Sequence, residues 1–199
     1  DQYLKTRKLF QGKKNSINIL EKENEKIWFN NNIVIKYFKS EDISKKRVQR
    51  YKTLKEFVPK LLDHKKNMYS YTKVKGKIFS KISSDKIFQK LLKKIDALHK
   101  YNRVPNFSKK YIHSRCYNFY HKKTLDRVKL FYKKFNIRDN SLPINGSKKI
   151  KLASLLKKID WNELCDGKFS RYHGDLHFEN IIYTKKNEFK FLDWRHEFE

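Results

Sequence analysis

The sequence is poor in cysteine, glycine and proline, and it contains no long apolar run. Its 199 residues include two cysteines, five glycines and three prolines. Cys116 and Cys165 lie in no CxxC or histidine-rich setting, which argues against a disulfide framework or a zinc site and favours a reducing cytoplasm. The low glycine and proline content argues against a low-complexity or disordered chain.

No apolar run approaches the roughly 20 residues of a membrane-spanning helix. The first ten residues, DQYLKTRKLF, also lack the apolar core of a signal peptide. We therefore expect a cytoplasmic chain without a transmembrane segment. Because the sequence begins without Met, we expect it to be part of a longer protein.

Basic residues are abundant instead. Lysine and arginine total 49 against 21 acidic residues, which gives a formal charge of +28. Such a field attracts nucleic acid, anionic membranes or acidic metabolites. However, 40 of the 49 are lysines scattered through every segment, whereas phosphate-reading surfaces rely more on arginine. We expect the charge to bias substrate choice, with no specific nucleic-acid partner; a charge-driven nucleic-acid or membrane-surface binder is the least favoured alternative.

The first 80 residues have the pattern of strands around one helix. Alternating or β-branched runs predict strands within 16–38, and the segments NMYSYTKV and GKIFSKI predict two more around Gly76. Acidic residues at 41–42 and apolar residues at helical spacing predict a helix over 41–58, stopped by Pro59.

The following residues are mainly helical in pattern. Helices are predicted from 85 to about 101, from 109 to 135 and from 151 to 159, with a polar connector at 136–149. The stretch NIIYTKKNEFKFLDW then predicts a β-hairpin that turns at Lys185 to Asn187.

One motif carries chemistry. The segment from His173 to Asn180 reads HGDLHFEN, which has the form H-x-D-L-x-x-x-N, and an apolar strand ends in Asp193 thirteen residues later. This is the order of the kinase catalytic loop and its metal-binding aspartate. Phosphoryl transfer needs alignment of the reactants and neutralisation of spreading negative charge. We expect Asp175 to accept the proton of the acceptor hydroxyl, and Asn180 and Asp193 to bind Mg²⁺ through oxygen. We expect His173 to shape the loop.

The same residues resemble the aminoglycoside phosphotransferase and choline kinase superfamily, with Gly174 where protein kinases have Arg. IVIKYF is similar to that family's third strand, and LDWRHEF is similar to the LDWRQDF form of bacterial members linked to surface-polysaccharide synthesis. The resemblance implies an α+β, protein-kinase-like, two-lobed fold. A small antiparallel β lobe with one helix would span 1–80, and a mainly helical lobe with a catalytic hairpin would span 81–199 and be incomplete at its C-terminus.

The resemblance also implies a nucleotide site. Lys36 would bind the α- and β-phosphates of ATP, and Thr72, Lys73 and Val74 would form the hinge against adenine, mainly through backbone atoms. The turn over the phosphates would contain three further residues, Gly12, Asn15 and Ser16. The helix after Lys36 would supply a glutamate to pair with it. The sequence has Gln49 where that glutamate is expected, and Glu56 is the next candidate.

These features predict an ATP- and Mg²⁺-dependent phosphotransferase acting on a hydroxyl of a small metabolite. A sugar, an amino-alcohol or a surface-glycan precursor is the expected acceptor, because a +28 chain repels a polycationic antibiotic. In related proteins such a module follows a sugar nucleotidyltransferase domain, so a fused or cooperating nucleotidyltransferase is an expected partner. A nucleotide-binding pseudokinase that scaffolds partners is the alternative: Asp175, Asn180 and Asp193 argue against it, and Gln49 leaves it open.

Overall fold

The structure is a computed structural model that describes residues 18–21, 24–100, 107–140, 143, 145–147, 149–167 and 169–196, with backbone only for 18–21. These residues divide into two compact units. Unit one contains the described residues up to Lys100 and those from Arg171 onward, and unit two contains those between. The lobe boundary predicted between residues 80 and 81 falls inside unit one. The lobe boundary remains a prediction. The lobes of a kinase are separated by the nucleotide cleft, whereas the two units here are defined by how the residues pack.

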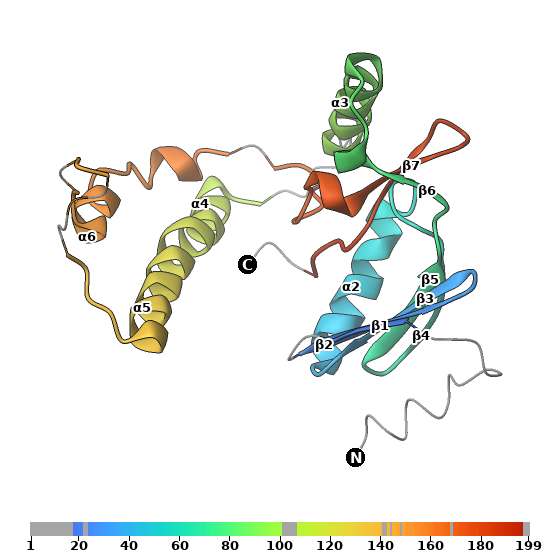
Figure 1. Cartoon of the computed structure of the whole chain (residues 1–199), viewed down its shortest axis with the longest axis horizontal. Helices are drawn as coiled ribbons and strands as arrows, with labels where there is room; N and C mark the ends of the chain where they lie inside the picture. The colour runs from blue at the N-terminus through green and yellow to red at the C-terminus, as the bar shows by residue number, and fades with distance from the viewer. Residues whose placement is uncertain are drawn as a thin grey trace. The chain divides into compact units, whose positions relative to one another are not determined.

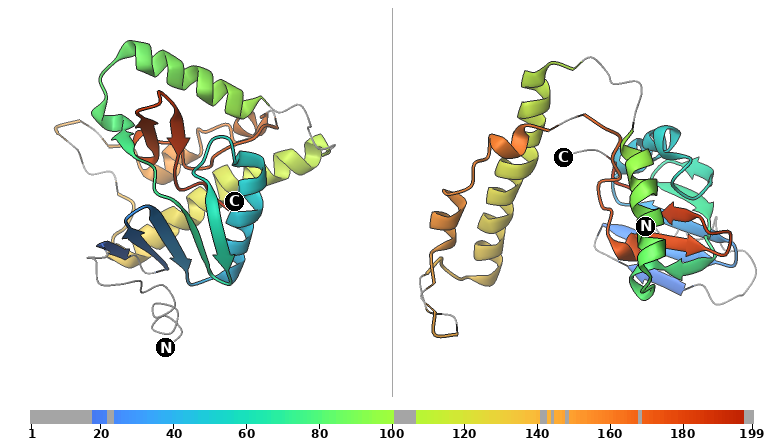
Figure 2. Two further views of the ribbon diagram at one scale, coloured as in Figure 1. Left: turned by 90° about the vertical axis from the view of Figure 1, so that its right-hand side faces the viewer. Right: turned by 90° about the horizontal axis from the view of Figure 1, so that it is seen from above.

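Unit one is built on a five-stranded antiparallel sheet in the order β1-β2-β3-β5-β4. The strands are β1 Asn18–Glu21, β2 Glu25–Asn30, β3 Ile33–Phe38, β4 Leu61–Lys65 and β5 Met68–Thr72. One helix, α2 Glu41–Leu54, packs against β3, β4 and β5 (Figures 1 and 2). Alternation along β3 puts Val34, Lys36 and Phe38 on the face that joins the main core, because successive side chains point to opposite faces. Ile35 packs on the other face.

The sheet contains one strand that the sequence pattern did not predict. β4 shows no apolar alternation, because only its first and fourth residues are even partly buried. It pairs with β5 across a turn in which Lys66 has φ of 51°. Helix α2 ends at Leu54, four residues before the predicted end at residue 58. At this end the N–H groups of Phe57 and Val58 both donate to the Leu54 carbonyl.

A second sheet holds the predicted hairpin. β7 Ile181–Thr184 and β8 Phe189–Phe191 pair antiparallel, and β6 Gly76–Ile78 joins the free edge of β7. Beyond Ile78 the chain turns into a 3₁₀ helix, η1 Phe79–Lys81, so the strand predicted through residue 82 is shorter than expected. A Cβ on Gly76 would lie 2.3 Å from the carbonyl oxygen of Tyr183, so only glycine fits this strand pairing.

The core of unit one joins its two chain segments. Trp194, Phe191 and Ile181 from the C-terminal segment are at most 1% exposed and pack with side chains of the first hundred residues, including Leu54 and Tyr69. Two further helices belong to this unit, α3 Asp85–His99, as predicted, and the 3₁₀ helix η4 Phe178–Asn180. The hydroxyl of Ser84 caps α3 by accepting from the N–H of Ile87.

Unit two is helical. The predicted helix over 109–135 is confirmed as a continuous run of α4 Lys109–Tyr117, the π-helix η2 Asn118–Lys122 and α5 Lys123–Phe135. The shorter helix is α6 Leu152–Leu156, and η3 Glu163–Cys165 is a 3₁₀ turn. Both cysteines are buried free thiols in this unit.

Among the described helices of the whole chain, none combines the length and apolarity that crossing a bilayer requires. The predicted mixed α+β class with antiparallel sheets is therefore confirmed.

Candidate active site

His173 anchors the catalytic-loop segment through a buried side chain, which is 2% exposed. Its Nδ1 accepts from the backbone N–H of Asp175 at 3.3 Å, and its ring meets Phe191 edge to face. Burial lowers the pKa of His173 to about 4. A neutral, buried imidazole with this contact orients the loop, which is the role expected for it.

Gly174 allows the loop to lie against Arg195. Its φ is +91°, a backbone region that side chains rarely adopt. A Cβ at this position would lie 2.7 Å from Cβ of Arg195 and 2.9 Å from its Cγ. Glycine is therefore the residue that fits between His173 and Asp175.

The turn that carries Asp193 is fastened to the catalytic loop by two backbone hydrogen bonds. The N–H of Leu192 donates to the carbonyl of Asn180 at 2.7 Å, and the N–H of Arg195 donates to the carbonyl of His173 at 3.0 Å. Asp193 itself has φ of +59°, a conformation that costs free energy outside glycine and that tends to occur at functional sites. The hairpin thus returns Asp193 to the catalytic loop, as its spacing predicted.

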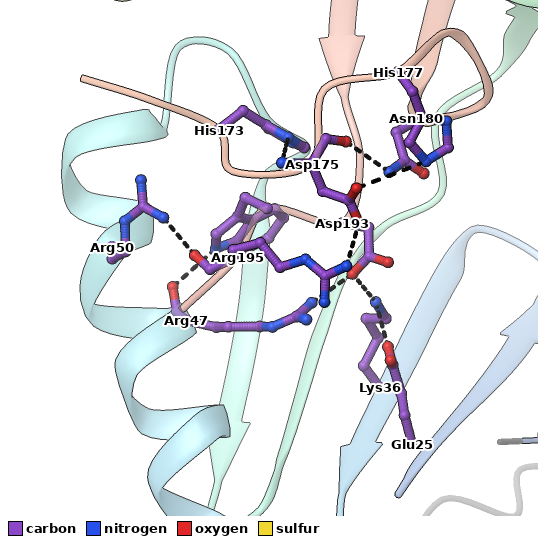
Figure 3. A network of polar contacts seen from close by, with 11 residues as sticks. Glu25, Lys36, Arg47, Arg50, His173, Asp175, His177, Asn180, Asp193 and Arg195 are labelled. Atoms are coloured by element: carbon purple, nitrogen blue, oxygen red, sulfur yellow. Dashed lines mark hydrogen bonds and ion pairs between the residues drawn. The ribbon is translucent and has the colours of Figure 1, made fainter. Parts of the chain in front are cut away.

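Two cations share one oxygen of Asp193 (Figure 3). Lys36 Nζ lies 2.6 Å from Asp193 Oδ1, and Arg47 Nη1 lies 2.5 Å from the same atom. Burial acts to raise the pKa of Asp193, but Lys36 and Arg47 lower it by more, so the net shift is well below the ordinary value. Burial opposes the charge of Lys36, yet Tyr69 and Asp193 raise the pKa of its ammonium above the usual value. Both groups therefore stay charged.

Lys36 pairs with a strand glutamate. Its Nζ lies 2.6 Å from Oε1 of Glu25 on β2, which is a diagonal neighbour because Lys36 is opposite Ile27. The expected helix glutamate is not found at either candidate position in the described structure, since Gln49 and Glu56 are both exposed. The prediction that α2 provides the partner is therefore wrong.

Helix α2 supplies arginine to the site instead. Arg47 is 2% exposed and contacts Asp193, while its backbone carbonyl accepts from Trp194 Nε1 at 2.9 Å. One turn later Arg50 donates to the carbonyl oxygens of Arg195, at 2.5 Å, and of Tyr172. The helix is thereby bonded to both the catalytic loop and the Asp193 turn, more than 120 residues away in sequence.

Asp175 has a cation of its own. Its Oδ2 accepts from Arg195 Nη2 at 2.6 Å, and its Oδ1 lies 4.0 Å from His177 Nε2. The side-chain amide of Asn180 donates to the backbone carbonyl of Asp175 at 2.9 Å. Since a carbonyl can only accept, this bond fixes which end of the Asn180 amide is nitrogen and leaves its oxygen at the other end.

The geometry is compatible with Mg²⁺. Both protein cations contact Oδ1 of Asp193, so Oδ2 is outside these contacts, and Asn180 offers an amide oxygen. One carboxylate and one neutral oxygen suit an ion that keeps several waters and takes its other ligands from phosphates. No three His, Cys, Asp or Glu side chains form a metal-holding group within the described residues.

The hinge residues lie at the end of β5. The N–H of Thr72 donates to the Lys60 carbonyl at 2.9 Å, and that of Lys73 donates to Asn32 at 2.8 Å, so an adenine would need other backbone atoms of this segment. Thr72 and Val74 line a surface cavity of about 760 Å³ whose lining residues do not include Lys36 or Asp193. Their role remains a prediction. The predicted phosphate turn, with Gly12, Asn15 and Ser16, lies outside the described residues.

The structure brings together Lys36, Asp175, Asn180 and Asp193 from three parts of the chain (Figure 3). Sequence reasoning missed Glu25 and Arg47 as members of this network. A signal for Glu25 was available. Ile27 is opposite Lys36 in the hairpin, and Glu25, two residues before Ile27, points to the same face of the sheet as Lys36. For Arg47 no signal was available, because the pattern cannot rank one basic residue among 49.

Comparison with known proteins shows the fold. No protein-family model and no curated protein matches the sequence. Among solved structures, the chain is similar to choline kinase LicA from Streptococcus pneumoniae, with 13% identity and a TM-score of 0.51 over 98% of this chain and 67% of that one. It is also similar to APH(2″)-IIa in a ternary complex with streptomycin and ATP, with 15% identity and a TM-score of 0.56 over 97% and 70%.

A third similar structure is an ethanolamine kinase from Plasmodium vivax, with 16% identity and a TM-score of 0.50, covering 96% of this chain and 59% of that one. At these identities the likeness concerns the fold, and it confirms the kinase-like fold class implied by the sequence resemblance. The chain spans between 59% and 70% of the length of these three proteins.

Proposed function

We propose that this chain is an ATP-dependent phosphotransferase that moves the γ-phosphoryl group to a hydroxyl of a small metabolite. The observation that carries the proposal is the pair of backbone hydrogen bonds that fasten the Asp193 turn to the catalytic loop. They gather Asp175, Asn180 and Asp193, with Lys36, in one network. The fold shared with solved choline and ethanolamine kinases supports this.

In the proposed reaction Asp175 is the general base. The acceptor oxygen attacks the γ-phosphorus, and its proton passes to the Asp175 carboxylate. The bond between the γ-phosphorus and its bridging oxygen breaks, and ADP leaves with the electron pair. Lys36, held by Glu25 and Asp193, would orient the phosphates of ATP.

Asn180 and Asp193 would hold Mg²⁺, and Arg47 would keep the Asp193 carboxylate ionised and oriented. When bound, the ion neutralises the charge that develops on the phosphates. The acceptor class we propose remains a sugar, an amino-alcohol or a surface-glycan precursor. A cooperating or fused sugar nucleotidyltransferase remains the proposed partner.

The deciding experiment compares the chain with Asp175→Asn in a screen of such acceptors for ATP-dependent phosphorylation. The amide preserves shape but cannot accept the proton, so turnover should fall by roughly 10²- to 10⁴-fold. Nucleotide affinity, measured by calorimetry, should stay within about twofold, since the substitution leaves Lys36 and Asp193 in place. Lys90→Ala, at an exposed position of α3, is the control and should retain turnover.

Equal turnover by Asp175→Asn would contradict the base assignment. Binding of ATP without phosphorylation of any acceptor would favour the pseudokinase alternative over the enzyme.

A further inference from the structure

Arg195 contacts the carboxylate of Asp175, the proposed general base. Its Nη2 is 2.6 Å from Asp175 Oδ2, and the two side chains are 47% and 28% exposed. Both groups therefore face solvent at the place where an acceptor would approach Asp175. The inference below rests on the proposed function and names its substrate class.

The backbone and stem of Arg195 are held by contacts that do not involve its guanidinium. The N–H of Arg195 donates to His173, and its carbonyl accepts from Arg50 at 2.5 Å. Its Cβ and Cγ press against Gly174, where there is no room for even one more carbon atom. Beyond Cγ the guanidinium contacts Asp175. The charged head can change partner while the residue stays in place.

This contact occupies one oxygen of the proposed base, Oδ2 of Asp175. A guanidinium is always protonated and cannot take the proton. An acceptor hydroxyl that donates to Asp175 has to share the carboxylate with this charge-assisted bond. A neutral acceptor offers the guanidinium only hydroxyl oxygens, which accept weaker hydrogen bonds than a carboxylate does. A cationic acceptor repels it in a chain of formal charge +28. An acceptor with its own anionic group offers Arg195 a new partner.

We propose that Arg195 is a specificity-determining residue that binds a phosphate or carboxylate group of the acceptor, close to the hydroxyl that is phosphorylated. On binding, the guanidinium moves from Asp175 to the acceptor anion. The same event fixes the acceptor by a bidentate contact and frees Asp175 for the hydroxyl. The substrate class is thus an anionic hydroxy compound, such as a sugar phosphate or a sugar acid.

The test measures binding of matched compounds by calorimetry, with Mg²⁺ and a non-hydrolysable ATP analogue at saturation so that the nucleotide phosphate site is filled. The panel pairs glucose 6-phosphate and glucuronate with glucose, and glycerol 3-phosphate with glycerol. Choline and ethanolamine represent cationic acceptors. We expect at least one anionic member to bind about tenfold or more tightly than its neutral counterpart, as a charged hydrogen bond implies.

Three variants locate that preference. Arg195→Ala should remove it, and Arg195→Lys should retain only part of it, because the ammonium keeps the charge without the fork. Lys90→Ala removes one positive charge from an exposed position of α3 and should leave the preference unchanged. Affinity for the ATP analogue should stay within about twofold in Arg195→Ala. A larger loss would assign Arg195 to the nucleotide and overturn the inference.

Equal affinity for charged and neutral members, a preference for choline or ethanolamine, or binding of no member would also overturn it. The outcome is distinguishable from failure of the proposed function. Anion binding that depends on Arg195 without phosphorylation would contradict the phosphotransferase and leave the anion site standing. Phosphorylation of a neutral acceptor at an unchanged rate in Arg195→Ala would support the phosphotransferase and contradict the anion site.

Discussion

At the scale of single residues, Asp193 is the anion on which the site depends. Two cations contact it, and the lysine also pairs with Glu25. Removing one partner from a buried ion cluster leaves an uncompensated charge and costs about 3–5 kcal/mol. Asp193→Ala would therefore unbalance Lys36 and Arg47, whereas Asp193→Asn keeps the shape and a hydrogen-bond acceptor.

We predict that ATP with Mg²⁺ raises the melting temperature, because the ligand binds only the folded state. In Asp193→Asn the Mg²⁺-dependent part of that rise should be lost, while Asp175→Asn should retain it. Thermal denaturation with ATP, with and without Mg²⁺, measures both. An unchanged rise in Asp193→Asn would remove this residue from the metal site.

His173 makes stability depend on pH. Its folded pKa of about 4 lies below the ordinary value near 6.5. The unfolded chain therefore binds the proton first as pH falls, so the contribution is complete above pH ~6.5 and is lost progressively down to pH ~4, by up to about 3 kcal/mol. Urea unfolding across this range should show the loss.

His173→Gln, which cannot titrate, should show a smaller decrease in unfolding free energy over the same pH range. Identical slopes for the two chains would mean that His173 is protonated as easily in the folded state as in the unfolded one.

At the scale of elements, α2 is bonded to the catalytic segments by arginines. Arg47 reaches Asp193, and Arg50 reaches the backbone of Tyr172 and Arg195. The position where a helix glutamate was expected, Gln49, is exposed. In this chain the helix therefore contacts Asp193 through Arg47, while strand β2 contacts Lys36 through Glu25.

We predict that Arg47→Met, which keeps the stem but removes the charge, destabilises the fold by about 3 kcal/mol or more, because it leaves a buried charge network incomplete. It should also weaken Mg²⁺-ATP binding more than ATP binding alone. Gln49→Glu is the matched substitution on the same helix. Being exposed, it should change stability by no more than about 0.5 kcal/mol. A large gain in nucleotide affinity from Gln49→Glu would mean that the expected helix pair forms after all.

The strands and helices were predictable where the apolar pattern was strong. The β3 strand, the hairpin at 181–191 and the helices α3 and α4 to α5 follow the period-2 and helical spacings of their residues. β4 was missed because its sequence, LLDHK, is largely exposed and carries no alternation. Its place in the sheet comes from pairing with β5, and such a pairing is not visible in the strand's own residues.

Within the site, the motif located Asp175, Asn180 and Asp193, because their spacing is set by one loop and one hairpin. The partners of Lys36 and Asp193 depend on which side chains cross between elements. Arg47 is specified by the rotation of its helix, which a single sequence with many similar charges does not determine. Glu25 follows from the register of the β2–β3 hairpin, and that signal was overlooked.

At the scale of the whole molecule, the charge of +28 governs encounters with polyanions. Lysines are distributed through both units and through every described strand from β2 to β8 except β5 and β7. Only nine of the 49 basic residues are arginine, the residue on which phosphate-reading surfaces rely more. We expect such a field to bring polyanions close without selecting a nucleotide sequence.

We predict that any binding to nucleic acid is weak, indifferent to sequence and steeply weakened by salt, since it depends on counterion release. Fluorescence anisotropy with unrelated oligonucleotides at 50 and 200 mM salt measures this. Binding of one sequence at nanomolar affinity that persists at the higher salt would instead promote the nucleic-acid reading.

The division of unit one between two distant chain segments has a consequence for synthesis. The strands and helix of the first hundred residues lack Phe191 and Trp194, which complete their core. Between Lys100 and Trp194 the ribosome has to add roughly 94 residues, which takes about 5 to 19 s at ordinary elongation rates. For that interval the nascent sheet carries an open apolar face. Chaperone occupancy on ribosome-bound chains should therefore rise once the first hundred residues emerge, and fall only after the segment that ends in Trp194 has left the exit tunnel.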